Sequence, residues 1–535
     1  MKTTPSEVTV SPSTPLSKAA PEVLQLEFSR ILGQISRHSV VFFAGTSFTM
    51  AAGYLVKIYV ARVLGAKQLG LYALGMTLVS LTQLFGMLGL QGTTARYVAV
   101  YNSTGKFNEL RGFLTRSVSI VISLNLIFSI GLAFSGRVIA RSLYHAPDLS
   151  QYMPLFAVLA FLGALNVFYC QVLGGFKDVA KRTVITSFIG SSLVIVLTVA
   201  LLSLGTEMWG YLAAQIVNSV VVVWLLVAVA RKLRPAAARF SRAPLPPLDP
   251  EIKAFAAAAF GMSALDFLVS QADKILLGLY LNPSLVGIYV LASTLSAVIP
   301  IILQSVNQIF APVIADLHAQ SRLDVLQKLF QTLTKWVLAL TFPMAWVIIV
   351  FAVPLMRIFG PDFVAGWPVL VIGAVGQLVN CGAGSVGYLL LMSGNQRRLI
   401  RVQFVMAGVS LLVNLTLIPA LGILGAALAA ACVNVAGNLW NLSQVHKALR
   451  ITPYNRSYWA LLIPAGFTAA AVLLLRFYTG SIIHQWLVTL LALVLSYAVF
   501  CGLAVAYSLN PDDRMIARSA WSQLRDGMQK LGANS

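Results

Sequence analysis

Long apolar runs are the feature that most restricts what this chain can fold into. A helix needs about 20 consecutive, mostly apolar residues to cross the hydrocarbon core of a bilayer, and the sequence contains fourteen such runs. We expect membrane-spanning helices at about 39–61, 71–95, 117–136, 152–174, 183–204, 208–230, 254–281, 286–314, 334–355, 367–392, 399–419, 423–445, 458–477 and 485–508. Only 10% of the residues are charged, whereas soluble proteins carry about 25%. The sequence therefore predicts an all-α polytopic membrane protein.

The basic residues predict the orientation of these helices. If the N-terminus is cytoplasmic, 30 of the 38 Lys and Arg residues lie at the inner face, six lie in outer loops, and Lys57 and Lys274 lie within spans. This is the distribution that the positive-inside rule describes. We expect a multi-pass protein of the cell (inner) membrane with both termini in the cytoplasm. The net charge of +21 then reflects topology, and no nucleic-acid partner is predicted because no RNA- or DNA-binding module interrupts the spans.

An internal repeat divides the chain into two halves. Alignment of the segment 57–78 with 274–295 gives less common identities at Lys57/Lys274, Gly70/Gly287, Tyr72/Tyr289 and Thr77/Thr294. A slightly shorter shift aligns 146–148 with 360–362 in the corresponding loops. Six spans, an even number, separate the copies. The halves should therefore face the same way, as a parallel repeat with a binding cavity between them.

The repeat and the loops suggest six parts. We expect a cytoplasmic N-terminal tail that could carry an interfacial helix (1–38), an N-terminal six-helix bundle (39–230), a Pro-rich basic cytoplasmic linker (231–253), a pseudo-symmetric C-terminal six-helix bundle (254–445), an extra helix pair (446–508) and a cytoplasmic tail (509–535).

The segments RVLGAKQLGLYAL and GMLGLQGTTARYVA resemble the opening of the O-antigen and oligosaccharide flippases. The likeness rests on Arg62, Leu64, Gly65, Gly70, Tyr72, Gly89, Leu90, Arg96 and Ala99. This family belongs to the multidrug, oligosaccharidyl-lipid and polysaccharide exporter superfamily. The resemblance implies two six-helix bundles, a central cavity and alternating access. It also implies transfer of a polyprenyl-diphosphate-linked oligosaccharide from the cytoplasmic to the outer leaflet. The implied partners are this substrate, membrane lipids and glycan-assembly enzymes.

Two lysines within the membrane are candidates for holding the diphosphate. Lys57 and Lys274 are equivalent in the repeat and lie in the outer third of the first and seventh spans. Across a cavity, two cations could bind one anionic diphosphate. The alternative is that each amine extends toward the nearby outer interface.

Two acidic residues of the seventh span are candidates for ion coupling. Asp266 and Asp273 are seven residues apart and therefore share one helix face. The first half has Thr49 and Val56 at the matching positions. We expect these carboxylates to carry a proton or sodium ion, and the alternative is a structural ion pair with a lysine.

Further polar residues near the cytoplasmic helix ends could contact substrate. Arg96, Arg116 and Arg401 could receive the diphosphate, or could simply mark topology. Gln91 and Gln308 are equivalent in the repeat and could face sugar hydroxyls, or could form interhelical hydrogen bonds.

Nothing in the sequence predicts an enzyme, a cofactor or a metal site. The five histidines are scattered, the four cysteines lack metal-ligand spacing, and no phosphate-binding GxxxxGK[ST] loop occurs. Two alternatives remain open. A cation-coupled multidrug exporter would need an acidic, aromatic cavity and usually twelve spans. A membrane glycan polymerase or ligase would need a large outer loop with Arg and His, and the outer loops here are short.

Overall fold

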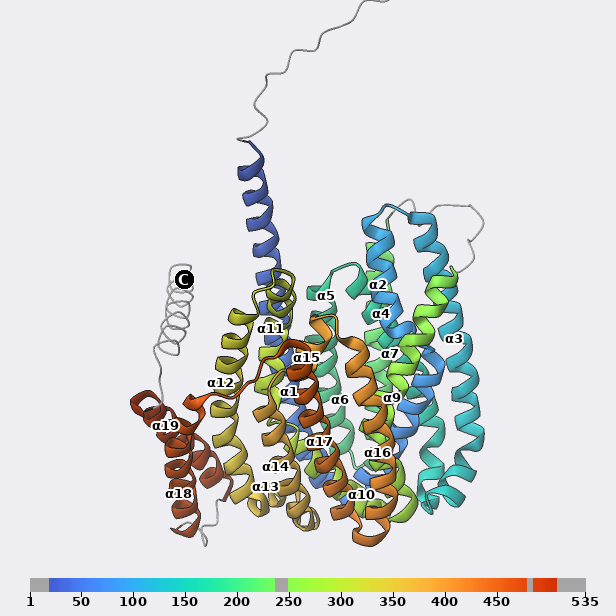
Figure 1. The fold of residues 1–535 in the computed structure, drawn as a ribbon. Helices are drawn as coiled ribbons and strands as arrows, with labels where there is room; N and C mark the ends of the chain where they lie inside the picture. Colours follow the sequence, from blue (N-terminus) through green and yellow to red (C-terminus); the bar gives the residue numbers. More distant parts are fainter. Residues whose placement is uncertain (1–18, 236–248, 479–484, 508–535) are drawn as a thin grey trace, which may run out of the picture.

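The computed structural model describes residues 19–235, 249–478 and 485–507, and every regular element within these ranges is a helix (Figure 1). The C-terminal tail 509–535 and most of the predicted linker lie outside the described residues, as do residues 1–18. The described helices confirm the all-α polytopic fold class. The domain boundaries stay a prediction.

The first half contains α1 to α7. The helices are α1 (Ala19–Met87), α2 (Leu90–Ser103), α3 (Phe107–Val138), α4 (Met153–Gly175), α5 (Val179–Thr183), which continues through a π-helical stretch into α6 (Ser191–Ser203), and α7 (Glu207–Leu233). Helix α1 is broken at Gly65, where φ is 73° and ψ is 176°. A side chain with a Cβ rarely adopts such a backbone, so glycine permits this break.

The second half starts with α9 (Pro250–Tyr280), which is capped by the Asp249 carboxylate. It continues with α10 (Pro283–Ser296), α11 (Ile301–Ala319), α12 (Leu323–Val350), α13 (Ala352–Phe359), α14 (Trp367–Ala383), α15 (Val386–Met392), α16 (Gln396–Leu421) and α17 (Ile423–Leu449). The last pair, α18 (Leu462–Tyr478) and α19 (Gln485–Tyr507), packs against α12.

The predicted number of fourteen spans is not confirmed. By length and composition, eleven helices among the described residues could cross a membrane, or twelve if α10 and α11, bent by 51°, form one broken span. Two differences have a local cause. Most of the first two predicted spans, 48–61 and 71–87, lies in the single stretch Phe48–Met87, which is broken only at Gly65. Helix α18, at the thirteenth predicted span, has only 17 residues.

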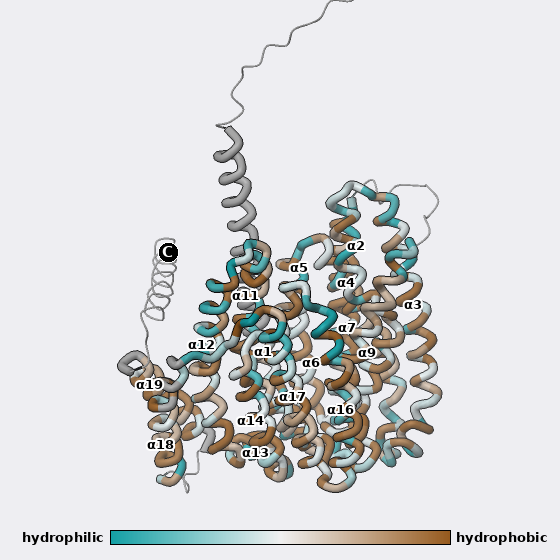
Figure 2. Tube along the Cα trace, viewed as in Figure 1, coloured by the Kyte–Doolittle hydropathy of each residue, from teal (hydrophilic) through white to brown (hydrophobic). Residues whose placement is uncertain are grey.

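The helix surfaces match a membrane environment. Figure 2 shows apolar residues along the length of the bundle and hydrophilic residues mainly at the helix ends near α2, α11 and α12. Large apolar side chains such as Phe134 and Phe477, each 83% exposed, lie on the outside. In water such a surface would be an aggregation hazard, whereas lipid tails cover it at no such cost.

Two glycines that are equivalent in the repeat bring the halves together. A Cβ added to Gly70 of α1 would lie 2.6 Å from the carbonyl carbon of Pro283, and one added to Gly287 of α10 would lie 3.1 Å from that of Ala66. Each glycine is therefore packed against the backbone at the start of the other's helix segment. Ala66 and Pro283 are themselves equivalent in the repeat. The contact is reciprocal, as at a two-fold axis.

The outer loops repeat this equivalence. Pro147–Tyr152 and Pro361–Gly366 are both 3₁₀ helices of six residues that begin with proline, at aligned positions of the two halves. Between the halves, the Arg62 Nε donates a hydrogen bond of 2.7 Å to the carbonyl oxygen of Ile358. In this conformation the two halves are thus joined at the face predicted to be outside.

Candidate transport site

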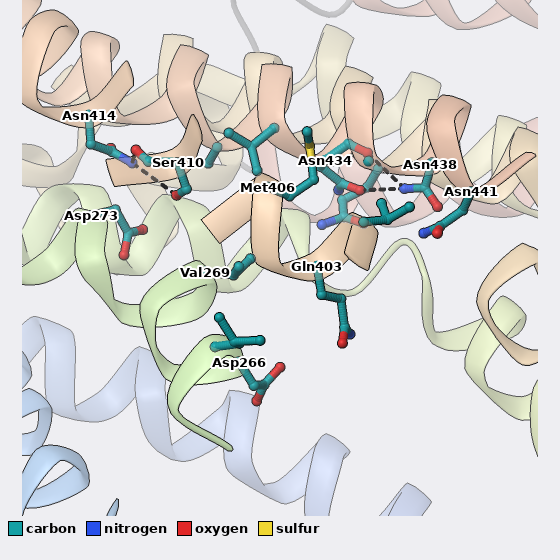
Figure 3. Close-up of a pocket in the computed structure, with 16 residues that line it drawn as sticks. Asp266, Val269, Asp273, Gln403, Met406, Ser410, Asn414, Asn434, Asn438 and Asn441 are labelled. Carbon is teal, nitrogen blue, oxygen red and sulfur yellow. Dashed lines mark hydrogen bonds between the residues drawn. The ribbon is translucent and has the colours of Figure 1, made fainter. Parts of the chain in front are cut away.

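A polar pocket of about 350 Å³ lies inside the second half, between α9, α14, α16 and α17. Asp266 and Asp273 of α9 both line it, as their spacing predicts (Figure 3). The other lining residues are Leu265, Val269, Gln377, Val402, Gln403, Met406, Ser410, Asn414, Ala430, Val433, Asn434, Gly437, Asn438 and Asn441. The lining side chains include carboxylates, amides and a hydroxyl, but no aromatic ring and no Lys, Arg or His. The pocket therefore suits water and a small cation.

Asp273 is held by hydrogen bonds from its neighbours. The Tyr289 hydroxyl donates to its Oδ2 at 2.6 Å, and the backbone N–H of Lys274 donates to its Oδ1 at 2.8 Å. The Lys274 ammonium is 3.9 Å from Oδ1, at the limit of an ion pair. No described residue gives the Asp266 carboxylate a hydrogen bond or an ion pair. The structural ion pair that was the alternative for these acids is therefore weak at Asp273 and not formed at Asp266.

An array of amides completes the pocket and was not singled out from the sequence. Asn414 lies on α16 one turn after Ser410, and its Nδ2 donates a hydrogen bond of 2.8 Å to the backbone oxygen of Ser410. On α17 the Asn438 Nδ2 donates to the Asn434 Oδ1 at 2.6 Å, and Asn441 follows one turn later. The helical spacing of these residues is the signal that could have identified them, because it places polar groups on one face of an apolar span.

The two candidate lysines adopt matching orientations. The Lys274 Nζ donates to the backbone oxygen of Ser270 at 2.7 Å and to Gln271 Oε1 at 3.0 Å. The Lys57 Nζ lies 5.3 Å from the ring centroid of Tyr54. Tyr54 and Gln271 are themselves equivalent in the repeat. Both amines thus turn back along their own helix and away from its outer end, and neither extends toward the outer interface.

The other predicted site residues lie outside the pocket. Arg96 sits where α2 meets α9, with its guanidinium carbon 4.5 Å from the ring centroid of Phe255. Arg401 is exposed at the start of α16, and Arg116 is half-buried on α3. Gln91 and Gln308 are both exposed. The roles of these five residues in substrate binding stay predictions.

The contact between α2 and α9 is a second connection between the halves. Next to Arg96, the Tyr97 hydroxyl donates to Glu251 Oε1 at 3.3 Å. Burial raises the pKa of the Tyr97 phenol, and the nearby Glu251 carboxylate adds to this effect, so the hydroxyl stays a proton donor at neutral pH. Below them, a Cβ at Gly89 would lie 2.6 Å from the backbone nitrogen of Phe260. The halves therefore also touch on one side near the predicted cytoplasmic face.

A comparison with protein families identifies the chain. The family model for polysaccharide biosynthesis proteins matches residues 59–363, which is more than half of the chain. The chain belongs to the polysaccharide biosynthesis protein family.

Two relatives of this polysaccharide biosynthesis protein are described as flippases. It is 23% identical over 461 residues to the probable flippase AglR of Haloferax volcanii, covering 82% of this chain and 90% of AglR. It is 22% identical over 404 residues to the probable low-salt glycan biosynthesis flippase Agl15 of the same organism, covering 74% and 80%. The predicted resemblance to the oligosaccharide flippases is confirmed.

Solved structures establish the fold of the polysaccharide biosynthesis protein. It matches the lipid II flippase MurJ in an inward closed conformation with a TM-score of 0.68 at 14% identity, covering 87% of this chain and 98% of MurJ. A multidrug resistance MATE family transporter of the MOP superfamily, in an inward-facing conformation, matches with a TM-score of 0.59 at 15% identity, covering 77% and 98%. Flippases and drug exporters thus share this architecture.

Proposed function

We propose that this protein is a flippase that moves a polyprenyl-diphosphate-linked oligosaccharide from the cytoplasmic to the outer leaflet of the cell membrane by alternating access. Both chain ends lie in the cytoplasm in this proposal. The observation that carries it is the pair Lys57 and Lys274, which are equivalent in the repeat and turn their amines in the same direction along α1 and α9. The substrate's diphosphate is the anion that such a pair would hold.

The proposed transport cycle uses the contacts between the halves. In this conformation the Gly70–Gly287 packing and the Arg62 hydrogen bond to Ile358 join the predicted outer ends of the helices. Substrate would enter from the cytoplasmic side in this state. These outer contacts would then separate while the cytoplasmic ends close, so that the sugar is released outside. Contacts with glycan-assembly enzymes remain an expectation of the same proposal.

The substrate clamp can be tested by removing each lysine. A charge-assisted hydrogen bond contributes about 1.5–3 kcal/mol, so Lys57→Ala or Lys274→Ala should weaken diphosphate binding by about 10- to 150-fold. Surface glycan is measured in cells that lack their own copy of the gene, with protein abundance checked by immunoblot. Lys67→Ala is the matched control, since Lys67 forms an exposed outer ion pair with Asp148. Normal export in both single variants and in the double variant would refute the clamp.

The acidic pocket supports a second element of the proposal, coupling to a proton or sodium ion. A carboxylate and carboxamide oxygens are hard ligands that suit such ions. Asp273 lies beside Asn414 at one end of the pocket, and Asp266 lies two turns away toward the predicted cytoplasmic end of α9 (Figure 3). The pocket lies wholly within the second half, which agrees with the lack of matching acids in the first half.

Coupling can be measured in proteoliposomes with a fluorescent polyprenyl-diphosphate-linked oligosaccharide as the probe. A proton gradient and a sodium gradient are imposed in separate experiments, and the accelerating ion identifies the coupling species. Asp273→Asn should abolish the acceleration, while Asp148→Asn, which alters the exposed outer ion pair, should retain it. Flipping at the same rate with and without either gradient would exclude the coupling role of Asp266 and Asp273.

The acidic pocket also suits a second candidate function, cation-coupled export of drugs. The shared fold with a multidrug resistance transporter allows it. Lys57 and Lys274 argue against drug export, because their positive charges would repel cationic drugs. Expression in a drug-sensitive host separates the candidates: unchanged susceptibility to cationic drugs is expected, and lowered susceptibility that depends on Asp273 would favour the exporter.

A further inference from the structure

Polar side chains of two helices form a seam along the pocket. On α16 they are Gln403, Ser410 and Asn414, and on α17 they are Asn434, Asn438 and Asn441. On each helix they recur at intervals of three, four or seven residues, which keeps them on one face. Figure 3 shows them in a row facing α9, with Asn441 at one end and Asn414 beside Asp273 at the other. The amides therefore lead from one end of the pocket to the buried acid.

The seam reaches across much of the membrane. From Gln403 to Asn414 the rise along α16 is about 16 Å at 1.5 Å per residue, compared with about 30 Å for the hydrocarbon core. Asn441 lies eight residues, or about 12 Å at 1.5 Å per residue, before the end of α17 at Leu449, in the predicted cytoplasmic half of that helix. Asp273 lies seven residues before the outer end of α9. The seam thus runs from the cytoplasmic half of the membrane to the outer half.

Buried oxygens along the seam lack partners within the described part of the chain. Asn414 is only 1% exposed, yet its Oδ1 accepts no hydrogen bond there, and the buried Oδ1 of Asn441 accepts none either. An unsatisfied buried acceptor costs about 1–3 kcal/mol. The pocket can supply the missing partners, since its volume of about 350 Å³ far exceeds the roughly 10–15 Å³ of cavity volume that one water needs. Both ends of the seam therefore require water or a cation.

Several of the corresponding positions in the first half are apolar. Gly205 and Gly422 are turn glycines with positive φ between the last two helices of each half, and the shift that aligns Lys57 with Lys274 also aligns them. With these glycines taken as equivalent, Asn434 and Asn441 fall on Val217 and Trp224, and Asn414 falls on Leu197. These three amides are therefore found only in the half that contains the two acids.

We propose that this seam is a hydrated path that connects Asp273 with the cytoplasmic face, and that the coupling ion leaves Asp273 along it into the cytoplasm. All the residues that line the path belong to the second bundle. This inference rests on the proposed ion coupling. The ligands are water and a small monovalent cation, which the amide oxygens solvate on the way.

Thiol accessibility tests the path without measuring transport. The four native cysteines are replaced, and Asn434→Cys or Asn441→Cys is introduced on α17. Membrane vesicles of both orientations are treated with a membrane-impermeant cationic methanethiosulfonate. Leu439→Cys is the matched control, because Leu439 lies on α17, is 51% exposed and does not line the pocket. A thiol in apolar surroundings has a raised pKa, and each pKa unit removes about nine-tenths of the reactive thiolate.

We expect both seam thiols to react from the cytoplasmic face at least about tenfold faster than the control, and to react slowly from outside. Reaction no faster than that of Leu439→Cys would overturn the path. Gln403→Cys on α16 repeats the test if an α17 variant does not fold. Labelling together with gradient-independent flipping would refute coupling but retain the hydrated seam. Gradient-driven flipping without labelling would refute the seam alone.

Discussion

The packing of Gly70 against Gly287 gives a quantitative prediction about how the halves are held together. A Cβ at position 70 would lie 2.6 Å from the Pro283 carbonyl carbon, whereas ordinary contacts begin at 3.4 Å. The obstacle is backbone, so no rotamer change can relieve it. Helices α1 and α10 must therefore separate by at least about 0.8 Å, and overpacking of this kind costs about 1–3 kcal/mol.

The assay is unfolding by SDS in mixed micelles, which reports the free energy of unfolding of each variant. Gly70→Ala and Gly287→Ala should each lower it by about 1–3 kcal/mol. Gly53→Ala is the control on the same helix. No atom lies within 4 Å of its added Cβ, and alanine is favoured over glycine in a helix interior by about 1 kcal/mol.

The reciprocal geometry adds a stricter expectation. Both substitutions push the same two segments apart, so the separation made by one provides room for the other. The double variant Gly70→Ala/Gly287→Ala should therefore cost less than the sum of the single variants, by at least about 0.5 kcal/mol. Additive costs, or single variants as stable as Gly53→Ala, would refute the reciprocal contact.

Two further predictions concern Asp273 and the contact near the cytoplasmic face. Tyr289→Phe removes the hydroxyl that donates to Asp273. Because losing a hydrogen bond to a charged group costs about 1.5–3 kcal/mol, the ion concentration for half-maximal flipping should change by at least about tenfold. An unchanged value would exclude Asp273 as the ion ligand. Arg96→Gln removes the cation stacked on Phe255, a contact that contributes about 0.5–2 kcal/mol. Crosslinking of cysteine pairs between α2 and α9 should therefore become slower. The control Arg401→Gln, on the exposed start of α16, should leave the crosslinking rate unchanged.

The fold class and the repeat could be predicted because both depend on local patterns. The length of an apolar run is sufficient to indicate a membrane helix, and a polar identity such as Lys57/Lys274 is easily recognised among apolar residues. The number of spans was harder to predict. Helix α1 passes through Gly65 with only one non-helical residue, and α10 and α11 meet at a bend of 51°. Hydropathy cannot detect such breaks, because they depend on backbone angles.

The site was predictable only in part. The seven-residue spacing was enough to predict that Asp266 and Asp273 share a face, and both line one pocket. Their coupling role stays a prediction, as does the lysine clamp. The asparagines of α16 and α17 were missed because each one alone resembles an interhelical hydrogen-bonding residue. Only the packing of α16 and α17 against α9 and α14 shows that they line one pocket with Asp273.

The containment of the acidic pocket within one bundle limits how energy can be transferred. A bound ion can bias two conformations only by the difference in its affinity for them. If α9, α16 and α17 moved as one rigid body, the ion would bind equally well before and after the bundles rock, and its gradient could perform no work. Among the described helices that carry polar pocket side chains, α9 is the one that also packs closely on α1 and α2. Productive coupling therefore requires α9 to shift against α16 and α17 during each cycle, so that the second bundle is itself deformable.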